Sequence, residues 1–328
     1  MEIHGRGRRV GDNSGPTPRY IGGRAGHDWI AVERAGVYAP GGRYPLPSSV
    51  LMGVVPARTA GVESVWVASP RPRPITLAAA AVAGADGLLS VGGAHAIAAL
   101  AFGTLVPAVD LIVGPGNRWV TAAKKHVFGE VGIDGLAGPS ELVVIADAEA
   151  DPRTVADDLI AQAEHDTDAV PILVSTSAET IAAVDAALAK ALATLPTADT
   201  AAEALRSNGR ACLVESLERA AEITDRLAPE HLELCVEDAP ALAERVRAYG
   251  GLFVGAASAE VFGDYGAGPN HVLPTGGSAR FQAGLSVGTF LRASTWLAAG
   301  GPALAGDAAR LARLEGLEGH ARSALRRV

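Results

Sequence analysis

Residues 109–129 read VDLIVGPGNRWVTAAKKHVFG, and this stretch contains the pattern that decides the fold. A short apolar run ends in a glycine turn, and a stretch of helical character follows the turn. A strand that passes through a tight turn into a helix is the repeating unit of a parallel α/β sheet. We therefore searched the flanking sequence for further units of the same kind.

The same alternation occurs on both sides of this stretch. Runs such as GVYAP and SVWVAS precede it, and runs such as ELVVIAD and AVPILVST follow it, each leading into an Ala-rich helical stretch. The sequence predicts an α/β protein with two doubly wound, Rossmann-like parallel-sheet domains at 28–139 and 140–285. Residues 1–27 are predicted to be an irregular segment because they are basic and rich in Gly and Pro. Residues 286–328 are predicted to form a small helical segment that serves as a dimer arm.

Composition excludes several classes of protein. The chain has 328 residues, is 48% hydrophobic and carries a net charge of -8, which argues against nucleic acid as the main partner. Two cysteines are too few for a disulfide framework, so we expect a reducing compartment. There is no apolar signal-peptide core and no apolar run of membrane-spanning length, so we expect a cytoplasmic protein that binds no membrane.

Three glycine turns follow predicted strands in the first half of the chain. They are YAPGGRYP (38–45), VGGAHA (91–96) and GPGN (114–117). In open α/β sheets ligands collect at the carboxyl ends of strands, and backbone amides at a helix start can hold a phosphate. None of the three is a GxGxxG fingerprint, and each alone is compatible with an ordinary tight turn. Together they indicate a nucleotide site.

The stretch LAPEHLEL (227–234) places Glu230 beside His231 behind a proline. A carboxylate and an imidazole are the commonest proton-transfer groups, yet neighbours in a strand point to opposite faces. Pro229 provides a reason for an irregular turn, since it fixes its own φ and favours an extended Ala228. The alternative is a solvated loop end without function.

Further donors for a metal ion lie in three separate segments. Gln162 and His165 are three residues apart on one helix face, Asp264 and His271 lie in a loop rich in glycine, and His320 lies near the last helix. An oxygen donor, two imidazoles and a carboxylate suit Zn²⁺. Spacing alone does not show that these groups converge, and each one separately is compatible with a solvated surface position.

Residues 109–166, which contain the opening stretch, resemble the signature region of the histidinol dehydrogenase family. GVYAPGGRYPLPSSVLM, SVGGAHAIAALAFGT, LAPEHLEL and GDYGAGPNHVLPT resemble other blocks of that family, in the family's order. The resemblance covers about residues 28–325. It implies oxidation of L-histidinol to L-histidine through the aldehyde, with two NAD and a zinc ion that holds the substrate.

The resemblance also implies the roles of individual residues. Glu230 and His231 match the acid–base pair, in which His231 takes the alcohol proton and Glu230 activates the water that hydrates the aldehyde. In this family the C-terminal segment completes the site of the partner subunit, which implies a homodimer. The implied zinc ligands, which also hold the substrate together with His231, are Gln162, His165, Asp264 and His320. The implied further substrate contacts are Ser140 and Glu315, and the implied NAD contacts are Tyr38, His95 and Asn117.

Two features depart from the family pattern. The first recognisable block starts near Trp29, so we expect a chain that is short at its N-terminus. His95 stands where the family has glutamine, and imidazole is shorter than an amide and titrates. Three hypotheses therefore stand: a histidinol dehydrogenase, a related dehydrogenase for another small alcohol, and a non-catalytic zinc-binding paralogue.

Overall fold

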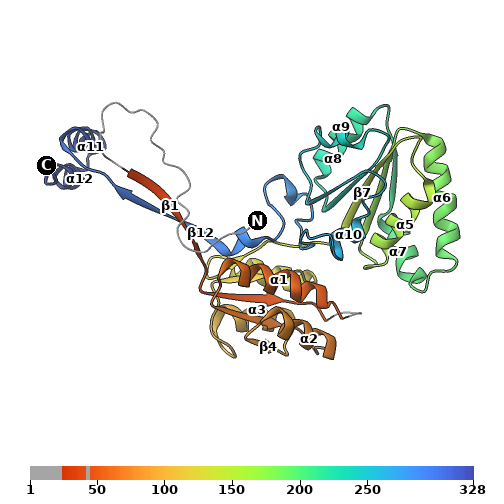
Figure 1. Cartoon of the computed structure of the whole chain (residues 1–328), viewed down its shortest axis with the longest axis horizontal. Coiled ribbons are helices and arrows are strands. Elements are labelled where there is room, and N and C mark those ends of the chain that lie inside the picture. Colours follow the sequence, from red (N-terminus) through yellow and green to blue (C-terminus); the bar gives the residue numbers. More distant parts are fainter. Residues whose placement is uncertain (1–23, 42–44) are drawn as a thin grey trace. The chain divides into compact units, whose positions relative to one another are not determined.

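A computed structural model describes residues 24–41 and 45–328 of the chain. The chain divides into two compact units. The larger unit comprises residues 33–290, and in the described part of the chain the smaller one comprises residues 24–32 and 291–328. The larger unit contains two five-stranded sheets, and every pair of strands within them is parallel (Figure 1).

The first sheet contains the strand and helix of the opening stretch. Helices α3 and α4 pack against it through Ile97, Leu100 and Val120, which are fully buried. The strands, in spatial order, are β4 (Gly87–Leu89), β3 (Ser64–Ala68), β2 (Arg34–Tyr38), β5 (Leu111–Val113) and β6 (Gly132–Ile133), and the helices are α1 (Pro47–Ala60), α2 (Pro74–Ala83), α3 (Gly93–Phe102) and α4 (Arg118–Val127).

The second sheet begins after residues 134–140, a segment that includes the predicted boundary at 139/140. Helices α5 and α6 cover one face of this sheet, and α8 and α9 cover the other (Figure 1). The strands, in spatial order, are β11 (Gly251–Val254), β10 (His231–Cys235), β7 (Glu141–Ala146), β8 (Val170–Ser175) and β9 (Arg210–Leu213), and the helices are α5 (Pro152–Ala163), α6 (Ala178–Leu192), α7 (Ala198–Asn208), α8 (Leu217–Leu227), α9 (Ala239–Ala243) and α10 (Glu260–Asp264).

Both sheets have the same strand order relative to their own first strand. In each sheet, the second and third strands of the chain extend the sheet on one side of the first strand, and the fourth and fifth strands extend it on the other side. The switch point lies between β2 and β5 in the first sheet and between β7 and β10 in the second. The predicted pair of doubly wound sheets is confirmed, because alternation of apolar runs with helices leaves few other arrangements for a parallel sheet.

The GPGN turn follows β5 at the switch point of the first sheet. Gly114 has a φ of 108°, and a Cβ there would lie 2.2 Å from the backbone oxygen of Tyr38. Only glycine fits this approach of two strand ends. Asn117 then caps α4, since its side-chain oxygen accepts from the N–H groups of Trp119 and Val120 at 3.1 and 3.2 Å.

The smaller unit is an antiparallel pair of strands with two helices. Strand β1 (Arg24–Ala31) pairs with β12 (Leu291–Ala298), and α11 (Pro302–Leu314) and α12 (Glu318–Leu325) follow. The segment predicted to be helical from residue 286 therefore contains a strand, after 3₁₀ turns at Ser278–Arg280 and Val287–Phe290. Among the described residues, no helix combines the length and apolar character needed to cross a membrane.

Strand β10 buries an unusual set of polar groups against α5. Leu232 and Leu234 face the core formed with α8 and α9, while Glu233 and Cys235 alternate to the other face. Glu233 is fully buried beside Asp158 of α5. Burial and the Asp158 charge raise the pKa of Glu233 to about 9, and burial raises the pKa of Cys235 to about 12. Near neutral pH Glu233 therefore carries a proton.

The raised pKa of Glu233 predicts a pH-dependent stability. Between its ordinary value of 4.5 and the folded value of about 9, the folded chain holds a proton that the unfolded chain releases, so stability falls as pH rises. The ionisation of Glu233 should lower the free energy of unfolding by up to about 1.4 kcal/mol for each pH unit. Glu233→Gln should abolish this contribution to the slope, as measured by urea unfolding between about pH 6 and pH 8. Glu237→Gln, at an exposed position, serves as the control. Equal pH slopes in parent and Glu233→Gln would contradict the assignment.

Candidate active site

The chain enters β10 through a strained connection. Helix α8 ends at Leu227, and Ala228 adopts a left-handed conformation with φ 48° and ψ 61°. The expectation of an extended Ala228 was therefore wrong. The N–H of Ala228 donates to the oxygen of Thr224 at 2.8 Å, so the helix cap decides the conformation rather than the following proline. A left-handed non-glycine residue stores strain, and such strain is concentrated at functional sites.

Glu230 and His231 converge on the backbone of one residue of the neighbouring strand. The N–H of Glu141 donates to Oε2 of Glu230 at 2.9 Å, and Nδ1 of His231 lies 3.0 Å from the backbone oxygen of Glu141. Because a carbonyl only accepts, Nδ1 carries the proton and Nε2 keeps its lone pair. Both residues are buried, at 7% and 6% exposure. They are not a solvated loop end.

Several carboxyl groups surround this imidazole. Nε2 of His231 lies 3.8 Å from Oε1 of Glu260, and Nδ1 lies 3.7 Å from Oε2 of Glu230. Burial lowers the pKa of His231 to about 4, so the ring is a neutral base at neutral pH. Burial, with the charge of Asp264 next, raises the pKa of Glu260 to about 8. Burial and the nearby charges of Glu141, Glu260 and Asp264 also raise the pKa of Glu230 well above its ordinary value.

Three of the four predicted zinc ligands belong to this unit, and two of them are neighbours. Nε2 of His165 lies 3.9 Å from Oδ2 of Asp264. Nδ1 of His165 lies 2.9 Å from the backbone oxygen of Ala161, which fixes the tautomer that leaves Nε2 free to bind a metal. Gln162 is fully buried on α5, and both atoms of its amide are without a hydrogen-bond partner among the described residues.

These residues fit a divalent cation. A buried amide without partners is costly unless a ligand satisfies it. Oxygen and imidazole donors suit zinc, and a cation would relieve the mutual repulsion of the carboxyl groups. One ligand atom each from His231, Glu260 and Asp264 lies within 4.8 Å of the others, which shows how closely the donors gather.

Sequence reasoning missed Glu260 and left His271 without a role. Glu260 lies four residues before Asp264, a spacing that places two helical side chains on one face and was a usable signal. It is 3% exposed. Nδ1 of His271 lies 3.6 Å from Oδ1 of Asp264, while His165 lies nearest the other carboxylate oxygen, Oδ2. Nδ1 of His271 is buried without a hydrogen-bond partner among the described residues, so His271 adds a further nitrogen beside the proposed metal donors.

The predicted cofactor residues lie at the carboxyl ends of the first sheet. The hydroxyl oxygen of Tyr38, at the end of β2, accepts from the N–H of Gly93 at 3.1 Å and so joins two of the three glycine turns. His95 is exposed on the first turn of α3. Asn117 is exposed, and because capping uses its oxygen, its amide NH₂ stays available for a ligand.

The second sheet uses its opposite end. Ser140, Glu230 and His231 lie at the amino ends of β7 and β10, which contradicts the expectation that ligands collect at carboxyl ends. The carboxyl end of the same strand pair is closed by its own loop. The side chain of Asp147 there accepts from the N–H of Glu237 at 2.8 Å.

Glu315 and His320 belong to the smaller unit. Glu315 follows α11 as its last cap residue, and His320 lies in the first turn of α12. Both are exposed. Their predicted roles as a substrate contact and a zinc ligand remain predictions.

A substitution of Gln162 separates metal binding from structural support. Gln162→Leu removes an amide that is buried without partners, so the metal-free variant should unfold at the same temperature as the metal-free parent or higher. Zinc at a hundredfold excess over Kd should raise the free energy of unfolding of the parent by about 2.7 kcal/mol. The same zinc concentration should stabilise Gln162→Leu much less, as measured by thermal unfolding. Gln162→Glu keeps an oxygen donor and should retain the zinc response. A metal-free Gln162→Leu that is strongly destabilised would show a structural role instead.

Comparisons with known proteins agree with this geometry. The model of the histidinol dehydrogenase family matches residues 13–328. The histidinol dehydrogenase of Thermus thermophilus is 53% identical over 297 residues, which cover 89% of this chain and 72% of that protein. The histidinol dehydrogenase of Parasynechococcus marenigrum is 48% identical over 316 residues, covering 94% and 72% of the two chains.

Solved structures show the same relationship. The crystal structure of histidinol dehydrogenase from Elizabethkingia anophelis superposes with a TM-score of 0.90 and 34% identity, covering 94% of this chain and 73% of that one. An acetylating aldehyde dehydrogenase from Geobacillus thermoglucosidasius, at a TM-score of 0.57 and 15% identity, shares the fold alone. The resemblance found in the motifs is confirmed: this chain belongs to the histidinol dehydrogenase family of NAD-dependent oxidoreductases.

Proposed function

We propose that this chain oxidises L-histidinol to L-histidine in two NAD-dependent steps with a zinc ion bound at Gln162, His165 and Asp264. The observation that supports it most is the neutral, buried His231, whose free Nε2 is surrounded by donors for a cation. The first oxidation converts the alcohol and NAD⁺ into the aldehyde, NADH and a proton. The second converts the aldehyde, water and NAD⁺ into the carboxylate, NADH and two protons.

His231 accepts the proton in the first step. The hydride can leave the carbon only as the hydroxyl proton is removed, and Nε2 of a neutral imidazole is the base that removes it. The bond to the backbone oxygen of Glu141 holds the ring in the tautomer with Nε2 free. Oε1 of Glu260 lies 3.8 Å from Nε2, so this carboxyl group faces the nitrogen that takes up the proton.

Glu230 acts in the second step. It removes a proton from the water that adds to the aldehyde, and the hydrate then loses its hydride to the second NAD⁺. Burial raises the pKa of Glu230, which makes its carboxylate a stronger base than an exposed glutamate. The N–H of Glu141 fixes one oxygen, so the other is free to face water.

Other residues bind and orient the substrate. Zinc, when bound, supplies a Lewis acid that orients and polarises the substrate nitrogens. Ser140 directly precedes Glu141, which holds the proton-transfer pair, and this position supports its role as a substrate contact. We further propose that Glu315 and His320 contribute to the site of a partner subunit in a homodimer, with His320 as the fourth zinc ligand.

NAD binds at the turns of the first sheet in this proposal. Tyr38, His95 and Asn117 are its contacts, and the switch point between β2 and β5 is the position at which such sheets bind nucleotides. The start of α4 is suited to hold the pyrophosphate, because Asn117 caps the N–H groups of Trp119 and Val120 but not that of Arg118.

Counting NADH per substrate tests the proposal. The zinc-loaded parent with limiting L-histidinol should form two NADH per molecule, because both oxidations occur at one site. Glu230→Gln should form the first NADH at a rate near that of the parent and the second about a hundredfold more slowly, because it lacks the base for hydration. Glu237→Gln, at an exposed position, should match the parent.

Each other outcome has a definite meaning. Equal slowing of both steps in Glu230→Gln would refute its assignment to the hydration step. A zinc-loaded parent that forms no NADH from L-histidinol would refute histidinol as the substrate. A screen of other amino-alcohols would then separate a dehydrogenase of different specificity from a non-catalytic paralogue.

A further inference from the structure

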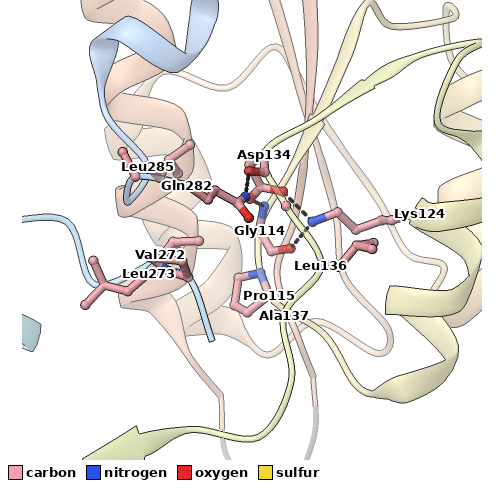
Figure 2. Close-up of a pocket in the computed structure, with 13 residues that line it drawn as sticks. Gly114, Pro115, Lys124, Asp134, Leu136, Ala137, Val272, Leu273, Gln282 and Leu285 are labelled. Carbon is pink, nitrogen blue, oxygen red and sulfur yellow. Dashed lines mark hydrogen bonds and ion pairs between the residues drawn. The ribbon is translucent and has the colours of Figure 1, made fainter. Parts of the chain in front are cut away.

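Lys124 is a buried cation that no step of the proposed reaction uses. It lies on α4, is 2% exposed, and its Nζ donates to the backbone oxygen of Gly114 at 3.0 Å. The same Nζ forms an ion pair with Asp134, which follows β6 (Figure 2). The next residue, Lys125, is exposed. Of these two adjacent lysines, only Lys124 is buried, and its side chain points to the turn that follows β5.

The pair holds both polar groups of a single peptide residue. Lys124 binds the oxygen of Gly114, and Oδ2 of Asp134 accepts from the N–H of Gly114 at 2.6 Å. Gly114 begins the GPGN turn, whose last residue, Asn117, caps α4. Because Gly114 has a φ of 108°, its conformation depends on such restraints and not on its own side chain.

The segment that contains Thr275 and Gln282 also contacts the chain around Asp134. The side-chain amide of Gln282 donates to the backbone oxygen of Asp134 (Figure 2). The N–H of Gly138 donates to the hydroxyl oxygen of Thr275. Gln282 and Thr275 belong to the segment that follows Asp264. A cavity of about 20 Å³, enough for one water molecule, lies between these segments.

Stability alone does not explain a buried ion pair. Desolvation of both charges offsets most of their attraction, and an apolar pair of similar volume is often as stable. The ion pair fixes the orientation of Gly114, because Lys124 holds its backbone oxygen and Asp134 holds its N–H. The turn that they fix is the one proposed to bind NAD.

We propose that Lys124 and Asp134 are positioning residues for the cofactor: they hold the Gly114 peptide so that the GPGN turn is preformed for NAD. This inference rests on the proposed NAD site. Loss of the Lys124 contact frees the oxygen of Gly114. The turn must then become ordered when NAD binds, and the free energy of this ordering weakens the observed affinity.

The test compares three variants by NADH affinity and by stability. Lys124→Met removes the cation and leaves Asp134 buried without a counter-charge. Lys124→Met with Asp134→Asn removes both charges but keeps an oxygen for the N–H of Gly114. Lys125→Met is the control, on the same helix but exposed. Kd for NADH is measured by fluorescence titration of the zinc-loaded protein, together with bound zinc and the melting temperature.

We expect Kd for NADH to rise on the order of tenfold in Lys124→Met, with zinc content unchanged. In the double variant the melting temperature should return towards that of the parent while Kd stays raised. Lys125→Met should match the parent in both. Recovery of affinity together with stability in the double variant, or affinity within about twofold of the parent in Lys124→Met, would overturn the inference. A parent protein that binds no NADH would instead refute the proposed cofactor, and this inference with it.

Discussion

The site depends on the burial of several carboxyl groups around one neutral imidazole. The charges of Glu260 and Asp264 add to the burial that raises the pKa of Glu230, Asp264 does the same for Glu260, and the fold provides no buried lysine or arginine near them among the described residues. Such a cluster is unfavourable unless a cation joins it. Gln162 adds a buried amide without partners, and His165 presents a free Nε2. Each of these groups is costly alone, and one bound metal ion would satisfy Gln162, His165 and Asp264 together. The same cation would lower the pKa of Glu230 and so release the base that the second oxidation needs.

The two sheets present opposite ends to the two parts of the proposed reaction. The first sheet presents glycine turns at the carboxyl ends of its strands, where its backbone amides are available for a nucleotide. The second sheet has the same strand order, but its carboxyl end is closed by Asp147 and its amino end carries the proton-transfer pair. In both sheets, contacts between side chains and backbone groups fix the positions of the proposed site residues. Glu141 orients Glu230 and His231, and Lys124 with Asp134 orients Gly114.

The fold was predictable because alternation of apolar runs with helices is repeated along almost the whole larger unit. The ribbon of β1 and β12 was not, since its strands are half-exposed and pair residues far apart in sequence. The proposed proton-transfer pair is adjacent in the sequence as Glu230 and His231, and the residue types of the proposed metal donors indicate their chemistry. The position of the pair at the amino end of β10 was not predictable. It depends on the parallel pairing of β10 with β7, which brings His231 to the backbone of Glu141, 90 residues earlier in the chain. Glu260 was missed because a five-residue helix leaves little periodicity to detect.

The most direct test of the central claim is to locate the metal ion. Anomalous diffraction at the zinc edge from crystals of the zinc-loaded protein would do this independently of turnover. We predict a single strong peak per chain, about 2.0–2.2 Å from a side-chain oxygen of Gln162, from Nε2 of His165 and from a carboxylate oxygen of Asp264. A peak at Asp158, Glu233 and Cys235, or zinc bound only at surface histidines with Gln162 still unpaired, would contradict the claim that a cation completes this site.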